Sequence, residues 1–302
     1  MKNQPDAQGS HSQGSEAAAP LIRNISDTAR WVAFYRALET ERPDAHFRDH
    51  LARRLAGERG EQIVRGMEKS AAFSWAIVVR TCVMDEMILR TIERDKLDTV
   101  VNLAAGLDAR PYRLPLPPTL RWIEVDLPGI VDYKEQTLAG ERAVCEHEVV
   151  KLDLSEVEAR RELFARVGAS SERALVISEG LLVYLAPEQV GALAADLHAQ
   201  ASFRWWLADI VRPEIIKRMA KTWGKRVAEA NAPFRFAPEE GTDFFRRFGW
   251  REAEFRSLME EARRLKREMP LAWLGRLIAR VQPHAKREKF RRMGGCALLE
   301  RA

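Results

Sequence analysis

The chain has 302 residues and a net charge of +5, and its content of 46% hydrophobic and 31% charged residues excludes a globally disordered protein. Its three cysteines, Cys82, Cys145 and Cys296, are far apart in the sequence, which excludes a disulfide scaffold and a thiolate zinc site, and we expect no metal. No apolar run is long enough to span a bilayer and no signal-peptide core is present, so we expect a cytoplasmic protein without a membrane partner.

The first 95 residues are expected to form a lead-in and a helical cap. Residues 1–24 mix Gly, Ser, Gln and Pro without periodicity, which predicts disorder. Apolar residues at helical spacing then predict three helices in the cap, 25–95: one from Ser26 or Asp27, one from Pro43 to Gly57 or Gly60, and one over 70–94.

From residue 96 onwards, strand patterns alternate with helical patterns. Short apolar segments predict strands at 98–104, 121–126, 146–153, 173–178, 203–211 and 295–300. Helices are predicted at 132–143, 156–167, 187–201 and 256–268. This alternation predicts an α/β domain over 96–302 that is built on a parallel, doubly wound sheet.

An insert at about 212–250 separates the fifth strand from the last, and we expect this insert and the N-terminal helices to determine substrate specificity. Its aromatic residues could line an apolar pocket or pack in the core, and Met219 is expected in the core; the aromatic residues are Trp223, Phe234, Phe236, Phe244, Phe245 and Phe248. The segment 251–302 that follows carries 14 Lys and Arg against 7 Asp and Glu. Because acidic residues are interspersed among the basic ones, we favour solvated helix faces over a nucleic-acid-binding surface.

The residues that follow the predicted strands point to a ligand site. Gly106, Asp126, Asp153 and Glu179 stand at strand ends, and ligands of open α/β sheets bind beyond the carboxyl ends of the strands. Gly106 lets a ligand approach the backbone, and Asp126 follows it by 20 residues, the spacing at which a carboxylate reaches a ribose diol. The pattern favours a nucleoside, although a glycine and an aspartate can also merely end two strands.

The turn around Gly106 favours one kind of nucleoside. It has a single glycine and places Asp108 where a pyrophosphate would need positive surroundings, so a dinucleotide is disfavoured. S-adenosylmethionine fits better, because it has no phosphate and carries a sulfonium cation. Arg80 could bind its carboxylate, or could pair only with Asp85 or Glu86; Asp108 could alternatively cap the next helix.

At these residues the sequence resembles the leucine carboxyl methyltransferase family, in particular its bacterial branch of class I S-adenosylmethionine-dependent methyltransferases. The resemblance extends over nearly everything after residue 25 and is carried by blocks at 28–33, 36–44, 52–57, 80–81, 101–110, 124–128 and 178–185, together with Lys134, Asp153 and Leu154. It implies a doubly wound, seven-stranded, Rossmann-like methyltransferase sheet with an N-terminal helical cap, and S-adenosyl-L-methionine as the cofactor.

The resemblance also implies cofactor-binding roles for five residues. Arg80 would hold the carboxylate of the cofactor, and Gly106 would pass beneath its methionine part. Asp126 would bind the ribose hydroxyls. Asp153 and Leu154 would frame the adenine, with Asp153 accepting a hydrogen bond from the exocyclic amine.

Further implied roles concern the substrate side of the site. Glu179 would lie near the cofactor's amino group and the substrate, and Tyr184 would support that region. The sequence departs from the family pattern at two places. Ala104 stands where the family has glycine, and Asp49-His50 replaces an Asp-Pro pair, so the role of that loop is open.

The chemistry narrows the choice of acceptor. Methyl transfer is an in-line displacement in which positioning supplies much of the catalysis, and a carboxylate acceptor needs no general base, whereas a phenol would benefit from one. No histidine stands at a strand end; His50 in the cap is a candidate base, beside Glu179 and Tyr184 as catalytic candidates.

Three hypotheses about function follow. The first is an O-methyltransferase acting on a carboxyl or hydroxyl group of a small molecule, such as a secondary metabolite. The second is a methyltransferase for the C-terminal carboxyl of a protein. The third is a cofactor-binding or nucleic-acid-binding protein without catalysis.

Overall fold

The computed structural model describes residues 25–66, 71–218, 221, 233–269 and 282–302. The predicted lead-in, 1–24, and two residues of the insert, Met219 and Trp223, lie outside the described residues.

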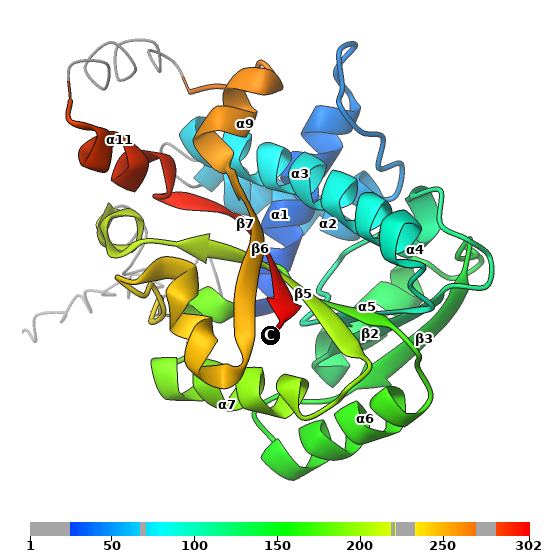
Figure 1. Ribbon diagram of the computed structural model, residues 1–302. Coiled ribbons are helices and arrows are strands. Elements are labelled where there is room, and N and C mark those ends of the chain that lie inside the picture. The colour runs from blue at the N-terminus through cyan, green and yellow to red at the C-terminus, as the bar shows by residue number, and fades with distance from the viewer. Residues whose placement is uncertain (1–24, 67–70, 219–220, 222–232, 270–281) are drawn as a thin grey trace, which may run out of the picture.

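Helices and strands alternate along the chain (Figure 1). The helices are α1 (Ile25–Thr40), α2 (Ala52–Gly66), α3 (Ala71–Asp95), α4 (Arg110–Arg113), α5 (Pro128–Thr137), α6 (Val157–Ala169), η1 (Leu182–Tyr184), α7 (Pro187–His198), η2 (Gly241–Phe248), α9 (Leu258–Arg264) and α11 (His284–Arg291). The strands are β1 (Thr99–Leu103), β2 (Arg121–Asp126), β3 (Glu146–Lys151), β4 (Ala174–Ser178), β5 (Phe203–Val211), β6 (Trp250–Ser257) and β7 (Gly294–Arg301).

The strands of the described chain form one seven-stranded sheet in the order β3-β2-β1-β4-β5-β7-β6. Strands β1 to β5 pair in parallel, and β7 is antiparallel to both β5 and β6. The predicted α/β class and seven-stranded sheet are confirmed, but the sheet is mixed and not wholly parallel. The chain passes from β5 to the far edge to form β6, and then returns to place β7 between them.

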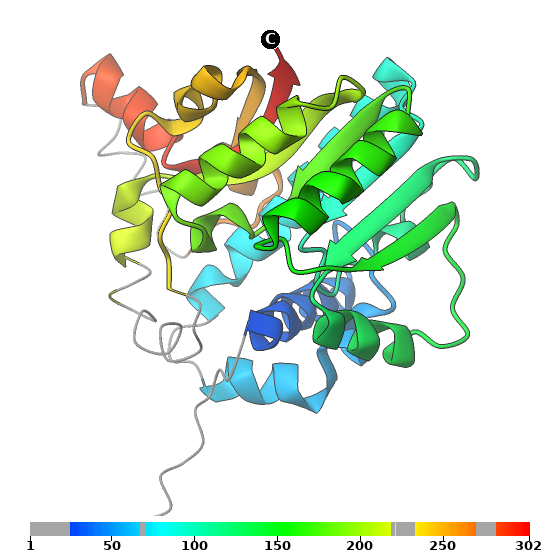
Figure 2. The ribbon, with the colours of Figure 1, turned by 90° about the horizontal axis from the view of Figure 1, so that it is seen from below.

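Helices cover both faces of the sheet (Figures 1 and 2). On one face, Phe164 of α6 and Leu193 of α7 belong to a buried apolar cluster with strand residues such as Val176. On the other face, Met84 of α3 and Leu265, just after α9, belong to a second cluster with strand residues. Helices α1 and α2 pack against the α4 and α5 region in a third cluster. Burial of these side chains provides the main driving force for the fold.

Two predicted helices begin several residues away from their predicted starts. The helix predicted at 132–143 is α5, which begins at Pro128 because proline suits the first turn of a helix. The helix predicted from Pro43 is wrong: residues 41–51 form turns and extended chain, and α2 begins at Ala52. It also does not end at a glycine in the predicted range, since it continues past Gly57 (φ 58°) across a kink.

Strand β6 was not predicted. Along this strand, Trp250 to Ser257, more exposed side chains alternate with less exposed ones, and four residues are charged. Both features are typical of a strand at the edge of a sheet. Trp250 was assigned to the insert and residues 256–257 to the helix predicted at 256–268, while residues 251–255 were assigned to no element. That helix, α9, is shorter, and begins only after β6 ends.

Candidate active site

A cavity of about 410 Å³ lies at the carboxyl ends of the parallel strands. Its walls come from α1, α3, the turn after β1, and the ends of β2, β4 and β5, and they continue to the beginnings of β7 and α9. Five of the predicted site residues line it: Arg80, Gly106, Asp126, Glu179 and Tyr184.

Gly106 and Asp126 meet at one end of this cavity. The parallel pairing of β1 and β2 brings the two turns together, and the backbone N–H of Gly106 donates to Asp126 Oδ2 at 2.6 Å. The backbone N–H of Leu127 donates to Oδ1 at 2.7 Å. Burial raises the pKa of Asp126, while these two hydrogen bonds act in the opposite direction. Gly106 has φ +53°, and a Cβ atom there would lie 3.3 Å from the Cβ atom of Ala29, so α1 closes tightly over the turn.

Ala104 begins the same turn in an unusual backbone conformation. Its φ is +52°, in the left-handed region that favours glycine, and it lines the cavity. The position where the family pattern has glycine is therefore one where the backbone itself favours glycine.

Arg80 of α3 is held by two carboxylates from neighbouring strands. Its Nε donates to Glu179 Oε1 at 2.9 Å, and its Nη1 donates to Asp209 Oδ2 at 2.8 Å. The alternative pairing with Asp85 or Glu86 is not the one observed, because those carboxylates contact other arginines.

Glu179 also contacts a second arginine, with 2.8 Å between its Oε2 and Nη1 of Arg110. Desolvation alone would raise the pKa of Glu179, but the charges of Arg110 and Arg80 outweigh it, and the pKa is lowered. Glu179 is therefore ionised at neutral pH and is a weak base.

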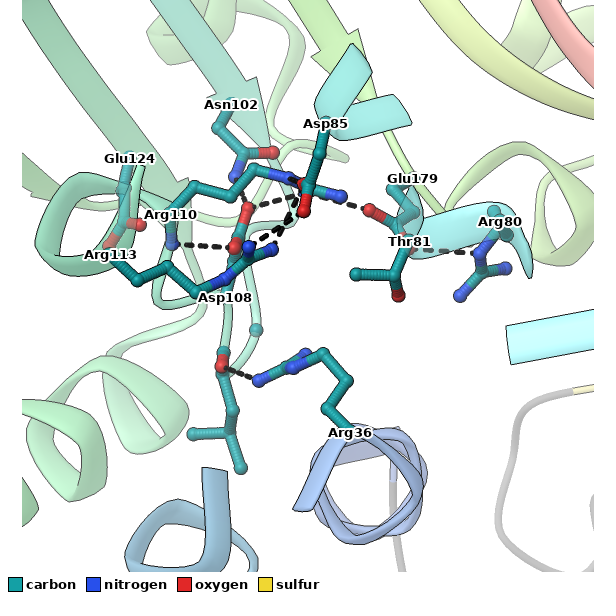
Figure 3. A network of polar contacts seen from close by, with 12 residues as sticks. Arg36, Arg80, Thr81, Asp85, Asn102, Asp108, Arg110, Arg113, Glu124 and Glu179 are labelled. Carbon is teal, nitrogen blue, oxygen red and sulfur yellow. Dashed lines mark hydrogen bonds and ion pairs between the residues drawn. The ribbon is translucent and has the colours of Figure 1, made fainter. Parts of the chain in front are cut away.

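These contacts are part of a larger arginine–carboxylate network, most of which is drawn in Figure 3. Asp85 of α3 bridges Arg110 and Arg113, with a shortest distance of 2.6 Å to each. Arg36 of α1 pairs with the buried Asp49 at 2.9 Å. In all, four arginines are connected to five carboxylates, so the network has one negative charge in excess: Arg36, Arg80, Arg110 and Arg113 with Asp49, Asp85, Asp108, Glu179 and Asp209.

Asp108 binds the first residue of α4 and a side chain of the network, although the N-cap residue of α4 is Ala109. Its Oδ1 accepts from the backbone N–H of Arg110, the first residue of α4, at 2.9 Å. Its Oδ2 accepts from Asn102 Nδ2 at 2.9 Å and from Arg110 Nη1 at 2.7 Å. Desolvation opposes ionisation, but the nearby cations, Arg110 foremost, hold the pKa of Asp108 well below its usual range.

The remaining predicted site residues lie in different places. Tyr184 stacks on Phe234, with 5.7 Å between the ring centroids, and burial raises the pKa of Tyr184.

Asp153 and Leu154 follow β3 but are not among the cavity-lining residues. Asp153 is exposed, and its Oδ1 accepts a hydrogen bond from Ser155 N–H. Their adenine-binding role stays a prediction. His50 is exposed and outside the cavity, so the structure does not bring it to the other candidates.

The aromatic residues of the insert divide between the two predicted roles. Phe234 and Phe236 line the cavity, and Phe236 also packs in the core. Phe244 and Phe245 are buried in the core, and Phe248 packs against it.

Asp209 and Arg110 are site residues that our sequence reasoning did not identify. Asp209 is the one carboxylate within the otherwise apolar end of β5, and its Oδ1 also accepts from Gly180 N–H at 2.7 Å. A lone carboxylate near the end of a buried strand was the feature that could have indicated it. Arg110 was part of a family-like block, but no contact could be assigned to it from sequence.

Two absences concern the described residues alone. No helix among them is long and apolar enough to cross a membrane. Among the residues that the structure describes, no group of three or more His, Cys, Asp or Glu side chains is arranged to hold a metal ion.

Comparison with known proteins identifies the fold and the family of the chain. A solved structure from Streptomyces avermitilis, described as a duf574 family protein, superposes with a TM-score of 0.59 at 13% identity over 91% of this chain and 97% of that one, and so shares the fold. The sequence model of the family described as leucine carboxyl methyltransferase matches residues 29–198, more than half of the 302 residues. The chain belongs to this family, as predicted.

Two relatives show how far the similarity extends. A Streptomyces coelicolor protein named "Putative S-adenosyl-L-methionine-dependent methyltransferase" is 36% identical over 191 residues, which are 58% of this chain and 65% of that protein. A Mycobacterium sp. protein with the same description is 30% identical over 261 residues, 78% of this chain and 86% of that protein. The chain thus spans less than two thirds of the first relative's length and most of the second's.

Proposed function

We propose that the protein is an S-adenosyl-L-methionine-dependent O-methyltransferase whose acceptor is a carboxylate or an acidic hydroxyl group of a small molecule. The observation that carries the proposal is the junction of Gly106 and Asp126 at one end of a cavity whose polar side has an excess of carboxylates. Membership of the leucine carboxyl methyltransferase family supports it. Three free thiols accord with a reducing compartment, and we place the enzyme in the cytoplasm.

The residues of the cavity fit this cofactor. Asp126 presents a carboxylate to the ribose hydroxyls, and the turn at Gly106 leaves no side chain between backbone and ligand. The negative charge in excess on the network suits a ligand with one net positive charge. Arg80 uses Nε and Nη1 for Glu179 and Asp209, and its Nη2 is the donor for the carboxylate of the ligand. We also assign Asp153 and Leu154, which follow β3, to the adenine side of the site.

The groups around the cavity favour an acceptor that is already ionised. When bound, the cofactor supplies an electrophilic methyl group on a positively charged sulfur. Among the described cavity-lining residues there is no histidine, and Arg80 and Arg110 hold Glu179 as a weak base. Tyr184, with its raised pKa, stays neutral at pH 7 and can donate a hydrogen bond. The residues therefore act by positioning and by electrostatics, with no proton to remove from the acceptor.

Cofactor binding tests the first half of the proposal. Replacing Asp126 by Ala removes the acceptor for the ribose hydroxyls, so we expect S-adenosylmethionine to bind roughly 10- to 100-fold more weakly, or about 1.5–3 kcal/mol. Isothermal titration calorimetry measures the change. The control is Asp132→Ala, which removes an exposed carboxylate from α5. Equal affinities for the two folded variants would contradict the role of Asp126.

Methyl transfer tests the second half. The enzyme is incubated with methyl-labelled S-adenosylmethionine and separate small-molecule and protein fractions of a cell extract. We expect the label in a small molecule, as an ester or ether by mass spectrometry. If the label appears only in protein, as a methyl ester of a C-terminal carboxyl group, the result would instead support a protein carboxyl methyltransferase.

A further inference from the structure

The cavity extends beyond the part that the proposed cofactor requires. The strand order places Asp126 on β2, Gly106 after β1 and Glu179 after β4, and neighbouring strands are about 4.8 Å apart. The cofactor residues thus span about 10 Å of the sheet edge. The cavity continues along the same edge to the end of β5, the start of β7 and the start of α9, which follows β6; β6 lies three more strand spacings along the sheet, about 14 Å.

The sheet pairing brings three distant segments to this second part of the edge. Val211, which ends β5, pairs with Gly294 at the start of β7, and Ser257, which ends β6, pairs with Gly295. The segments that adjoin these ends supply the side chains. They include Leu258 and Met259 of α9 and Met293 just before β7, and the backbone of Met293 accepts from Arg212 N–H at 2.9 Å.

The side chains here are mostly apolar, in contrast to the charged side chains at the β1–β4 ends. Ile210, Ile215, Phe236 and three methionines line it, while Asp126 and the network carboxylates other than Asp209 belong to the other part. Asp209, on β5, lies at the boundary between the two parts. Arg218, on the helical segment 213–218, is the charged side chain that the described lining adds here, and it already has a partner within the protein.

From this division we infer that the acceptor has a mainly apolar body, and that this body occupies the β5–β7–β6 end of the cavity with its ionised oxygen directed toward β4. The inference rests on the proposed function. A hydrophilic body would lose its hydration against these side chains without gaining hydrogen bonds, whereas methionine side chains adapt to irregular apolar shapes. Met259 and Met293 are then specificity-determining residues for the acceptor.

The test uses two acids of contrasting bodies on the full-length protein saturated with S-adenosylhomocysteine. We expect 2-naphthoate to bind and the polyhydroxy acid gluconate to bind at least 10-fold more weakly, both measured by titration calorimetry. Met259→Gln and Met293→Gln keep side-chain size but add an amide, and each should weaken 2-naphthoate binding about 5- to 10-fold. Leu38→Gln changes an exposed apolar residue of α1 outside the cavity and should leave it unchanged.

S-adenosylhomocysteine binding separates the possible failures. All three variants should bind it within twofold of the unmodified protein, because neither methionine lies near Asp126 or Gly106 along the sheet edge. If the nucleoside binds but gluconate binds as well as 2-naphthoate, or the methionine variants bind 2-naphthoate normally, the inference is overturned and the proposed function stands. If the nucleoside fails to bind the folded, unmodified protein, the proposed function itself fails.

Discussion

At the scale of single residues, Ala104 lines the cavity in a strained backbone conformation that lowers the stability of the fold. An alanine in the left-handed region costs about 1–2 kcal/mol, whereas glycine adopts it freely but loses more entropy on folding, about 0.5–1 kcal/mol. We therefore expect Ala104→Gly to raise the free energy of unfolding by about 0.5–1 kcal/mol, as measured by urea denaturation, and S-adenosylhomocysteine to bind at least as tightly.

The neighbouring alanine provides a matched control. Ala105 is not among the residues with positive φ, so Ala105→Gly has no strain to relieve and should destabilise the protein by about 1 kcal/mol. A loss of stability in both variants would show that the backbone at Ala104 is not strained.

The contribution of Glu179 to the free energy of unfolding should depend on pH, because the arginines of the network lower the pKa of its carboxyl group. Glu179→Gln leaves Arg80 and Arg110 without one of their carboxylates and should cost about 2–3 kcal/mol at pH 7. Because the pKa of Glu179 is lower in the folded protein than its usual 4.5, its charge stabilises the fold above that pH, and this contribution is lost as the pH falls further toward the folded-state pKa.

Urea denaturation of both proteins between pH 7 and pH 3 should show this dependence. The stability difference between them should shrink below about pH 4.5. The exposed Glu158→Gln is the control, with an expected effect under about 0.5 kcal/mol. A difference for Glu179→Gln that stays constant over the whole range would contradict the stabilising role of its charge.

Individual site residues could be predicted where the relevant contact is set by strand geometry. The 20-residue interval between Gly106 and Asp126 is one βαβ repeat, so parallel pairing of β1 with β2 necessarily brings them together. The partners of Arg80 could not be predicted in this way. They lie 99 and 129 residues along the chain, and no local pattern links an arginine of α3 to the ends of β4 and β5.

At the scale of elements, helix α2 depends on the kink at Gly57. The φ of +58° disfavours any side chain, and a Cβ atom there would lie 3.2 Å from the hydroxyl of Tyr133, which donates to the carbonyl of Leu55. We expect Gly57→Ala to lower the free energy of unfolding by about 2 kcal/mol, from backbone strain and displacement of Tyr133. Thermal and urea denaturation measure it.

Gly129 of α5 is the matched control. A Cβ atom there would meet nothing within 4 Å beyond its own turn of the helix, and the residue has no positive φ. Gly129→Ala should therefore stabilise α5 by about 0.5 kcal/mol through helix propensity. Destabilisation by both changes, to a similar extent, would mean that the kink at Gly57 is not the cause.

The parallel strands of the sheet were the elements best predicted. The predicted bounds of β2 and β5 agree with the structure, and those of β4 differ by one residue, because stretches that are mainly apolar between turn residues mark buried strands. Strand β6 was missed because its charged, alternating sequence, Trp250 to Ser257, is also compatible with a surface helix. The start of α2 was misplaced because residues 41–51 are held by a tertiary contact, the pairing of Asp49 with Arg36, and not by helix propensity.

At the scale of the whole molecule, the sequence predicted the class of fold but not the arrangement at the β5 side of the sheet. Alternation of strands and helices implies parallel neighbours, and it holds from β1 to β5. The direction of β7 and its place inside the sheet depend on pairings between β5 and a segment more than eighty residues later. The β5–β7–β6 end of the cavity depends on these same long-range pairings, so it could not be derived from any one segment.

The interior position of β7 has a consequence for the nascent chain. On the ribosome, β6 is synthesised before β7, which is its neighbour in the sheet among the described strands. Until β7 emerges, both β5 and β6 expose unsatisfied backbone groups that could recruit another polypeptide. Strand β6 carries four charged residues, Arg251, Glu252, Glu254 and Arg256, and charges on an unpaired strand disfavour aggregation.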